Sequence, residues 1–367
     1  MPAKEISKAE ICLPCTSIRE IQEFFCERLG FRWEAVFPAD DPGVLVLSGY
    51  GLRLRFERGD CDGVPPSRLR LEHSPRLGVS IDRPTVGPDG LQIEWVDTSS
   101  DAPAFVPRLQ PELTCSRLGE GDAWTVGRAG MLYRDLIPGH LGGRFTASQI
   151  QIPEGGLVPD SPHFHRVRFQ MIYCHRGWVR LVYEDQGPPF VLEAGDSVLQ
   201  PPLIRHRVLE CSAGLEVVEV ACPAHHETRA DWDLELPTSV VQETRKFGGQ
   251  RFVRHLAAGA IWMPWRQEGF EARPFGFASA TAGLGEARIV RRYGVHHPCD
   301  LTFDGEFCFL FVTAGNMSLE VSESLFENLG AGDALVLPQS MSHRIEEPTD
   351  DLEFLEVTLP ASLDGDN

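Results

Sequence analysis

The sequence lacks the runs that mark membrane, secreted or nucleic-acid-binding proteins. No stretch reaches the ~18 consecutive apolar residues of a membrane-spanning helix. The opening segment, MPAKEISKAE, has no apolar stretch of the kind found in a secretory signal. Lys and Arg form no basic run and the formal net charge is −19, so we expect no binding to nucleic acid or to an anionic membrane. These absences predict a cytoplasmic protein.

The ten cysteines form no recognisable framework either. The nearest pair, Cys12 and Cys15, has no second CxxC motif and no His pair to accompany it, which argues against a zinc knuckle. Reduced and mostly buried thiols are therefore expected, as in a reducing compartment.

What the sequence does have is many turn residues, with 35 Gly and 28 Pro in 367 residues. This composition is typical of many short strands joined by tight turns. The length suffices for two or three domains, and an apolar fraction of 42% is ordinary for a globular protein. We expect a mainly β protein.

Residues 1–60 predict a small α+β module of the order β-α-β-β-β. A strand is expected over Ile6–Leu13 and a helix over Ile18–Leu29, with Ser17 as its N-cap and Gly30 as its end. Three short strands follow, over Phe31–Phe37, Val44–Leu47 and Leu52–Phe56.

With the phrase FFCERLGFRWE, this order resembles a half-module of the glyoxalase/bleomycin-resistance superfamily. That superfamily often places metal ligands on the first and last strands, where this chain has Glu10 and Glu57. No histidine precedes His73, so the module is interpreted as structural or dimerising. Residues 61–130 are rich in turn residues, with one apolar strand at Leu91–Val96, and are expected to form a connector that packs over the rest.

The strongest signal of organisation is a long-range internal repeat. FQMIYCHRGWVRLVYE and LEAGDSVLQPPLIRHRVLE return later as FCFLFVTAGNMSLEVSE and LGAGDALVLPQSMSHRIEE. The flanking runs alternate apolar and polar residues, as half-buried strands do, and Gly-Asp turns separate them. Phe169 and Gly177 have the same separation as Phe307 and Gly315, and the spacing of Gly195, Pro201 and His206 equals that of Gly332, Pro338 and His343.

The first copy resembles the cupin superfamily through two motifs. One is HFHRVRFQ, from His163 to Gln170, followed after six residues by Gly177, and the other is GDSVLQPPLIRH, which ends at His206. The resemblance implies tandem jelly-roll barrels, a bicupin, with a metal-binding barrel at 131–235 and a degenerate second barrel at 236–367.

The resemblance implies that His163, His165, Gln170 and His206 hold a metal. Two histidines two residues apart project from the same face of a strand. Imidazole-rich sites with vacant positions suit a divalent transition metal, with Fe(II) as the first candidate and Ni, Cu, Mn or Zn as others.

Gln170 departs from the family pattern, since most metal-binding cupins have Glu there. An amide offsets none of the charge of a metal, so the site favours an anionic substrate. The candidate substrate contacts are Arg180, Tyr183 and Cys174, and no residue is assigned a catalytic role. Alternation along the strand predicts that Ile172 and Cys174 face inward.

The second barrel loses the ligands, with Leu301 and Phe303 in place of the HxH pair and Cys308 opposite Gln170, while His343 remains. His225 and His226 are interpreted as solvated loop residues between the barrels. The nearby residues His296, His297, Asp300 and Glu306 leave open an irregular second site.

Three functions remain open. The leading hypothesis is a non-haem dioxygenase acting on a small oxygenated aromatic or enolic acid. The second, favoured by Gln170, is a non-redox isomerase, lyase or cyclase acting on an anionic carbonyl compound. The third is a small-molecule-binding cupin without catalysis. Each has a small molecule as its partner, and a homodimer is a further expectation.

Overall fold

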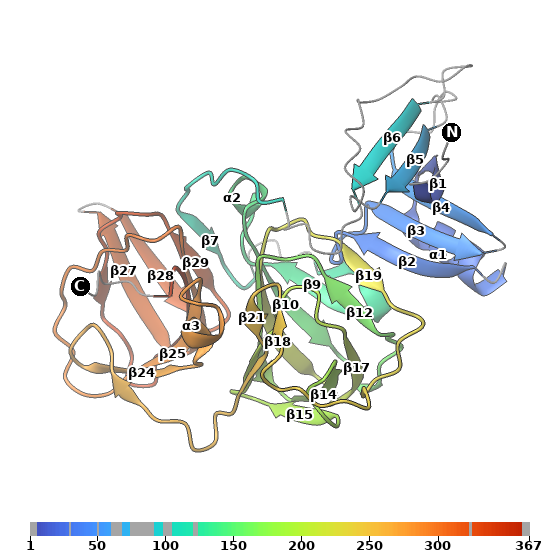
Figure 1. Ribbon diagram of the computed structural model, residues 1–367. Helices are drawn as coiled ribbons and strands as arrows, with labels where there is room; N and C mark the ends of the chain where they lie inside the picture. The colour runs from blue at the N-terminus through green and yellow to red at the C-terminus, as the bar shows by residue number, and fades with distance from the viewer. Residues whose placement is uncertain are drawn as a thin grey trace. The chain divides into compact units, whose positions relative to one another are not determined.

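The computed structural model (Figure 1) describes residues 6–28, 31–49, 51–59, 68–73, 92–97, 105–119, 124–322 and 325–361. The chain forms two compact units. One comprises Met1–Ala104, Ser161–Arg166 and His226–Leu234, and the other comprises Phe105–Asp160, Val167–His225 and Glu235–Asn367. Among the described residues, no helix has both the length and the apolar character needed to cross a membrane.

The N-terminal unit has the predicted β-α-β-β-β order. The Ser17 side chain accepts a hydrogen bond from the backbone N–H of Glu20 (3.3 Å), so the predicted N-cap is confirmed. The helix is shorter than predicted, because it changes to a π-helix after one turn. Its elements are β1 (Ile6–Cys15), α1 (Ile18–Gln22), η1 (Glu23–Arg28), β2 (Arg32–Phe37), β3 (Val44–Gly49) and β4 (Leu52–Arg58). Gly30 lies outside the described residues.

Four more strands extend this sheet, in the order β12-β19-β2-β3-β4-β1-β5-β6. β5 (Arg68–His73) and β6 (Gln92–Asp97) come from the segment expected to be a connector. β19 (Thr228–Ala230) pairs with both β2 and β12 (His163–His165), which carries the HxH motif. The sheet therefore uses strands from outside residues 1–60 at both ends, which covers edges that a five-element module would leave open.

The first jelly-roll barrel, green to yellow in Figure 1, has two sheets. One follows the order β22-β16-β13-β18-β10-β9-β8, and in the other β15, β14 and β17 are neighbours, with β11 on β17. The strands of the first sheet are β8 (Thr125–Val126), β9 (Leu132–Asp135), β10 (Thr146–Ile152), β13 (Phe169–Arg176), β16 (Ser197–Leu199), β18 (Leu215–Cys222) and β22 (Val253–His255). The others are β11 (Gly156–Leu157), β14 (Trp178–Tyr183), β15 (Phe190–Glu193) and β17 (His206–Cys211).

The second barrel, orange to red in Figure 1, repeats this plan. One sheet has the order β23-β24-β25-β31-β26-β29-β7 and the other the order β28-β27-β30. The first comprises β23 (Met263–Pro264), β24 (Phe270–Pro274), β25 (Glu286–Arg292), β31 (Glu353–Leu359), β26 (Phe307–Ala314), β29 (Ala334–Leu337) and β7 (Thr114–Ser116). The second comprises β28 (Leu325–Gly330), β27 (Asn316–Ser322) and β30 (Arg344–Glu346). The short elements are η4 (Arg128–Gly130), α2 (His140–Gly143), β20 (Lys246–Phe247), β21 (Gln250–Arg251) and α3 (Phe277–Ala280).

The repeated strands β13 and β26 share one large apolar core. Phe169, Met171 and Tyr173 on β13 are buried in a cluster with Phe307 and the alternating residues that follow it on β26. The intervening residues of β13, Ile172 and Cys174 among them, belong to a separate cluster inside the first barrel. This alternation confirms the prediction that Ile172 and Cys174 face the interior of the barrel. Only side chains on that face of β13 can contribute to a site inside the barrel.

The repeated glycines adopt the same backbone conformation. Gly195 and Gly332 both have φ of 93°, and each donates its N–H to a strand carbonyl at 2.8 Å, that of Cys174 and that of Val312 respectively. A residue with a Cβ is strained at this positive φ, which explains why glycine stands at the turn in both copies. The repeat in sequence is therefore a repeat in structure.

Candidate metal centre

Three buried imidazoles come together in the first barrel region. His163 and His165 lie on β12 and His206 begins β17, and one ring nitrogen from each lies within 4.8 Å of the others. The HxH spacing puts the first two rings on one face of the strand, with centroids 5.2 Å apart. Among the described residues this is the one group of His, Cys, Asp and Glu side chains arranged to hold a metal ion.

The remaining nitrogen of two of these rings is held by backbone carbonyls. Nδ1 of His163 lies 2.8 Å from the carbonyl of Ser161, and Nδ1 of His206 lies 3.1 Å from that of Ile204. A carbonyl accepts only, so Nδ1 carries the proton and donates in both cases. Nε2 is then left with its lone pair, which is the form that ligates a metal.

The third imidazole has a side-chain partner. Nδ1 of His165 lies 2.9 Å from Oγ1 of Thr228, which is opposite His165 in the register of β12 and β19. The ring of His226 packs edge-on against that of His165 at 5.3 Å and is buried, so our interpretation of His226 as a solvated loop residue was wrong. His225 is exposed, as predicted. The sequence around His226, CPAHHETRAD, has no pattern that predicts this burial.

An amide network surrounds His206. Gln200 Nε2 donates to Gln170 Oε1 (3.0 Å) and lies 3.2 Å from His206 Nε2. Tyr183 donates its hydroxyl proton to Gln200 Oε1 (2.8 Å) and stacks on the His206 ring at 5.3 Å. With Nδ1 of His206 protonated, its Nε2 lone pair accepts from the Gln200 amide, and a bound cation would replace that N–H as its partner.

Burial controls the protonation of these groups. It lowers the pKa of His206 to about 4, so the ring is neutral at pH 7. Burial, with a smaller contribution from the Glu219 carboxylate, raises the pKa of Tyr183 far above its ordinary value, so its hydroxyl remains a donor. Glu219 also accepts a hydrogen bond from Gln170 Nε2 (2.9 Å). His206 is therefore neutral, and one carboxylate, Glu219, lies behind the Gln170 amide.

These residues fit a divalent transition metal. Imidazole nitrogens are the donors that such ions prefer, carbonyl partners fix the tautomers of His163 and His206, and three ligands leave further positions for substrate. Gln170 adds an amide oxygen, which has a second lone pair beside the one that accepts from Gln200.

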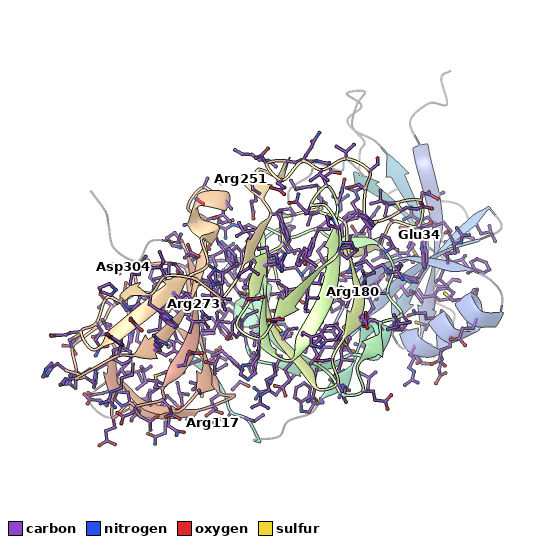
Figure 2. The ribbon with its side chains drawn as sticks, turned by 90° about the horizontal axis from the view of Figure 1, so that it is seen from below. Glu34, Arg117, Arg180, Arg251, Arg273 and Asp304 are labelled. Atoms are coloured by element: carbon purple, nitrogen blue, oxygen red, sulfur yellow. The ribbon has the colours of Figure 1, made fainter. Side chains whose placement is uncertain are left out.

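The three weaker candidates for substrate contact lie in different places. Tyr183 lies against His206, as described above. Cys174 is fully buried in the barrel core, and burial raises the pKa of its thiol to about 12, so it is a wall residue and not a nucleophile. Arg180, labelled in Figure 2, pairs with Glu210 (2.9 Å), and its side chain is 40% exposed, so it lies at the surface.

The carboxylates that the glyoxalase resemblance suggested do not form a metal group among the described residues. Glu10 is buried, with Arg53 Nε 3.7 Å from its carboxylate. Glu57 accepts a hydrogen bond from Arg55 Nε (2.6 Å). The resemblance of residues 1–60 to a glyoxalase half-module stays a prediction.

The second barrel fills the equivalent space with apolar side chains. Leu301, Phe303 and Cys308 are all buried in its core, and Leu301 forms a β-bridge with His343. Burial lowers the pKa of His343 to about 4, so this surviving histidine is a neutral core residue. The predicted loss of ligands is thus matched by a packed interior.

Among the residues that the structure describes, the irregular second site that the sequence left open does not form a metal-binding group. His296, Asp300 and Glu306 each have a partner in a different place. Those partners are the carbonyl of Ile345 for His296, Arg344 for Asp300, and Arg144 with Arg168 for Glu306.

Sequence reasoning missed Gln200, Glu219 and Thr228. Gln200 directly precedes the motif residue Pro201, and Glu219 is one of two glutamates in the mostly apolar run LEVVEVAC, so both had a local signal. Thr228 had none, because it reaches His165 only through the pairing of two strands that lie 63 residues apart along the chain.

No protein-family model and no curated protein matches the chain. Its structure is similar to the Lactobacillus farciminis oxalate decarboxylase in complex with formate, with 13% identity over 71% of this chain and 88% of that one and a TM-score of 0.51. A deletion variant of the Bacillus subtilis oxalate decarboxylase has 15% identity over 72% and 80% (TM-score 0.49), and a putative glyoxylate-induced protein from Pseudomonas aeruginosa has 12% over 70% and 92% (TM-score 0.47). The fold is that of tandem cupin barrels, a bicupin, as predicted.

Proposed function

We propose that the chain is a metal-dependent bicupin enzyme whose ion is held by His163, His165, His206 and Gln170. The observation that carries this proposal is the hydrogen bonding of the three rings. Each Nδ1 has a partner, which directs Nε2 toward the space they share. Histidines that only fill a core would not need all three Nδ1 atoms to be held in this matched way.

We further propose a dioxygenase acting on a small oxygenated aromatic or enolic acid, with Fe(II) as the metal. The bound metal would supply Lewis acidity and a place for O2 beside the substrate. The donors carry no charge, so an enolate, phenolate or carboxylate is favoured as the ligand that offsets the charge of the ion. Tyr183, kept protonated by burial, orients Gln200, which in turn orients Gln170.

The test is metal analysis combined with O2 uptake. Protein grown without added metal should contain close to one transition metal ion per chain, and the iron-loaded form should consume O2 with a member of a panel of catechols, enediols and small dicarboxylates. Oxalate belongs in the panel because the similar structure is named an oxalate decarboxylase. His163→Ala should lose both properties, and His343→Ala, in the second barrel, should keep both. A stoichiometric zinc site with no O2 uptake would overturn the dioxygenase.

The neutral amide of Gln170 favours a second candidate, a non-redox isomerase or lyase acting on an anionic carbonyl compound. Here the metal would act as a Lewis acid only. Turnover with Zn or Mn under strict anaerobiosis separates this reaction from the first. A cytoplasmic location and a homodimer stay predictions.

A further inference from the structure

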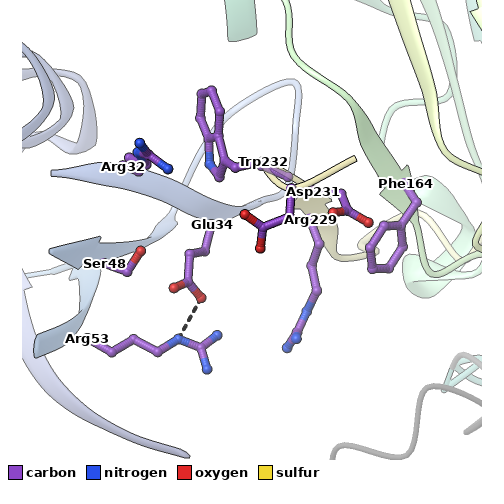
Figure 3. A pocket seen from close by; sticks show the side chains of 10 residues that line it. Arg32, Glu34, Ser48, Arg53, Phe164, Arg229, Asp231 and Trp232 are labelled. Atoms are coloured by element: carbon purple, nitrogen blue, oxygen red, sulfur yellow. Dashed lines mark ion pairs between the residues drawn. The ribbon is translucent and has the colours of Figure 1, made fainter. Parts of the chain in front are cut away.

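A pocket of about 340 Å3 lies within the N-terminal unit, outside the metal centre (Figure 3). Its walls come from β2, β3, β4, β12 and the stretch from Arg229 to Asp233, and we call it the β2–β19 pocket. Its volume is at the low end of the ~300–1,000 Å3 of small-molecule sites, so it suits a compact ligand.

The β2–β19 pocket and the imidazole cluster lie on opposite faces of the same strand pair. Phe164, which lines the pocket, stands between His163 and His165 on β12. Its Cα partner on β19 is Arg229, another lining residue, whereas the partner of His165 is Thr228. Side chains alternate along a strand, so the two sites share a wall but no side chain.

The lining carries equal numbers of charges of both signs. Three guanidinium groups and three carboxylates line one small volume. They are Arg32, Arg53 and Arg229, and Glu34, Asp231 and Asp233. A polyanion would meet all three carboxylates and a polycation all three guanidinium groups, so like-charge repulsion disfavours both. A small molecule that carries one charge of each sign matches this lining.

The charged groups stand on different walls. Arg53 on β4 pairs with Glu34 on β2 at 2.8 Å, and Figure 3 shows this pair on one side with Arg229 and Phe164 on the other. The side chains of Glu34 and Arg229 are 24% and 21% exposed, so a ligand in the pocket can reach them. Nε of Arg229 pairs with Glu227 at 2.9 Å, and a guanidinium has further N–H donors for a second anion. Trp232, which donates its indole N–H to the carbonyl of Trp33, adds an aromatic surface.

We propose that the β2–β19 pocket binds a small zwitterion of the α-amino-acid class with an apolar side chain. The guanidinium of Arg229 receives the carboxylate, in the geometry that arginine offers to such groups. Glu34 receives the ammonium group, and the side chain of the ligand packs on Phe164 and Trp232.

The experiment is calorimetric titration of the metal-loaded full chain with the proteinogenic L-amino acids, one at a time. We expect one apolar or aromatic amino acid to bind with one site per chain. Its amide, which lacks the carboxylate, and its N-acetyl form, which lacks the ammonium, should each bind at least about tenfold more weakly.

Variants of the lining residues test whether the ligand binds in the β2–β19 pocket. Glu34→Gln and Arg229→Gln should each weaken binding at least about tenfold, with melting temperatures checked so that a loss of fold is recognised. Arg19→Gln is the matched control, since Arg19 is an exposed arginine paired with Glu23 on α1 and η1, away from the pocket lining. It should bind as the wild type does.

Amino acids also chelate metals, so the metal-free variant His206→Ala is titrated in parallel. Binding should persist there. Loss of binding in His206→Ala would place the ligand on the metal and overturn the proposal. Equal binding of the N-acetyl form, or no binding by any amino acid at millimolar concentration, would overturn it too.

Discussion

In the first barrel β13 carries Gln170 beside buried polar side chains, whereas in the second barrel β26 carries Cys308 into an apolar core. The other faces of the same two strands are alike, since both pack into the core that the barrels share. The interior face and the packing face alternate residue by residue, so one can change while the other is kept. The residues that are alike in the two barrels therefore serve the fold. The residues by which the first barrel differs from the second are the candidates for chemistry.

A carboxylate on the last long strand is kept in both barrels. Glu219 on β18 and Glu356 on β31 have equivalent registers, since they oppose Ile172 on β13 and Leu310 on β26. Glu219 accepts from the Gln170 amide, while Glu356 is fully buried and paired with Arg266 at 2.7 Å, with Arg288 at 3.4 Å. The second barrel has thus replaced a site by an ion-pair network.

The largest contrast is expected for the equivalent histidines. His206→Ala should lower bound metal from about one ion per chain to below about a tenth, because a ligand is lost. His343→Ala should leave the metal content unchanged, since this ring lies in a packed core. Elemental analysis of both purified variants measures the difference. Equal metal loss in the two variants would contradict the expectation that only the first barrel holds the ion.

The next contrast is between the equivalent carboxylates. Glu356→Gln leaves two largely buried guanidinium groups (14% and 17% exposed) without their buried anion, so the free energy of unfolding should fall by about 3 kcal/mol. Glu219→Gln alters a single amide hydrogen bond, and we expect about 1 kcal/mol. Denaturant titration of the two variants gives both values. If Glu219→Gln were the more destabilising, the Glu356 network would not be the structural replacement described here.

A smaller effect is expected for Thr228→Val. This change removes the hydroxyl that holds Nδ1 of His165 and keeps the shape of the side chain. Metal affinity should fall by about 10–100-fold, as for other partners of ligating histidines. Competition with a coloured chelator measures the affinity. Thr358→Val is the control on β31 of the second barrel, and it should leave the affinity unchanged.

The last expected effect is a pH dependence of stability in the second barrel. Burial lowers the pKa of His343 to about 4 in the folded chain, against an ordinary value of 6.5. The unfolded chain therefore binds a proton that the folded chain does not, and stability falls as the pH drops from about 6.5 to about 4. His343→Leu should lessen this fall by at most about 1.4 kcal/mol per pH unit. Melting temperatures across this range test it, and parallel curves for variant and wild type would contradict it.

The repeat made most of the barrel architecture predictable from the sequence. Matched spacings of Gly195 and Gly332 located the turns, and the alternation along β13 correctly assigned Cys174 to the interior. The three histidines of the motifs come together as the resemblance implied. These features are local in sequence, or repeated in it, and so leave a pattern that can be read.

What the sequence did not predict depends on long-range pairing. The pairing of β19 with β12 and β2 joins segments far apart in the chain, so neither the Thr228 hydrogen bond nor the burial of His226 had a local pattern. Arg180 was assigned near the site because it is close in sequence, but its position on β14 directs it to Glu210. Whether a strand residue faces inward can be predicted from alternation, whereas the identity of its neighbour across the sheet cannot.

One sheet of each barrel also includes a strand from outside that barrel's own repeat. β22, which follows the first barrel in the chain, pairs with β16, and β7, which precedes it, pairs with β29 of the second barrel. A fragment that stopped at residue 235 would lack β22 and would expose both the edge of β16 and the apolar face of β13 that carries Phe169, Met171 and Tyr173. Such a fragment should self-associate, since open sheet edges and exposed apolar faces both promote association. The first barrel thus depends on the second to cover a sheet edge and an apolar face, so any expression design for the first barrel has to include the second.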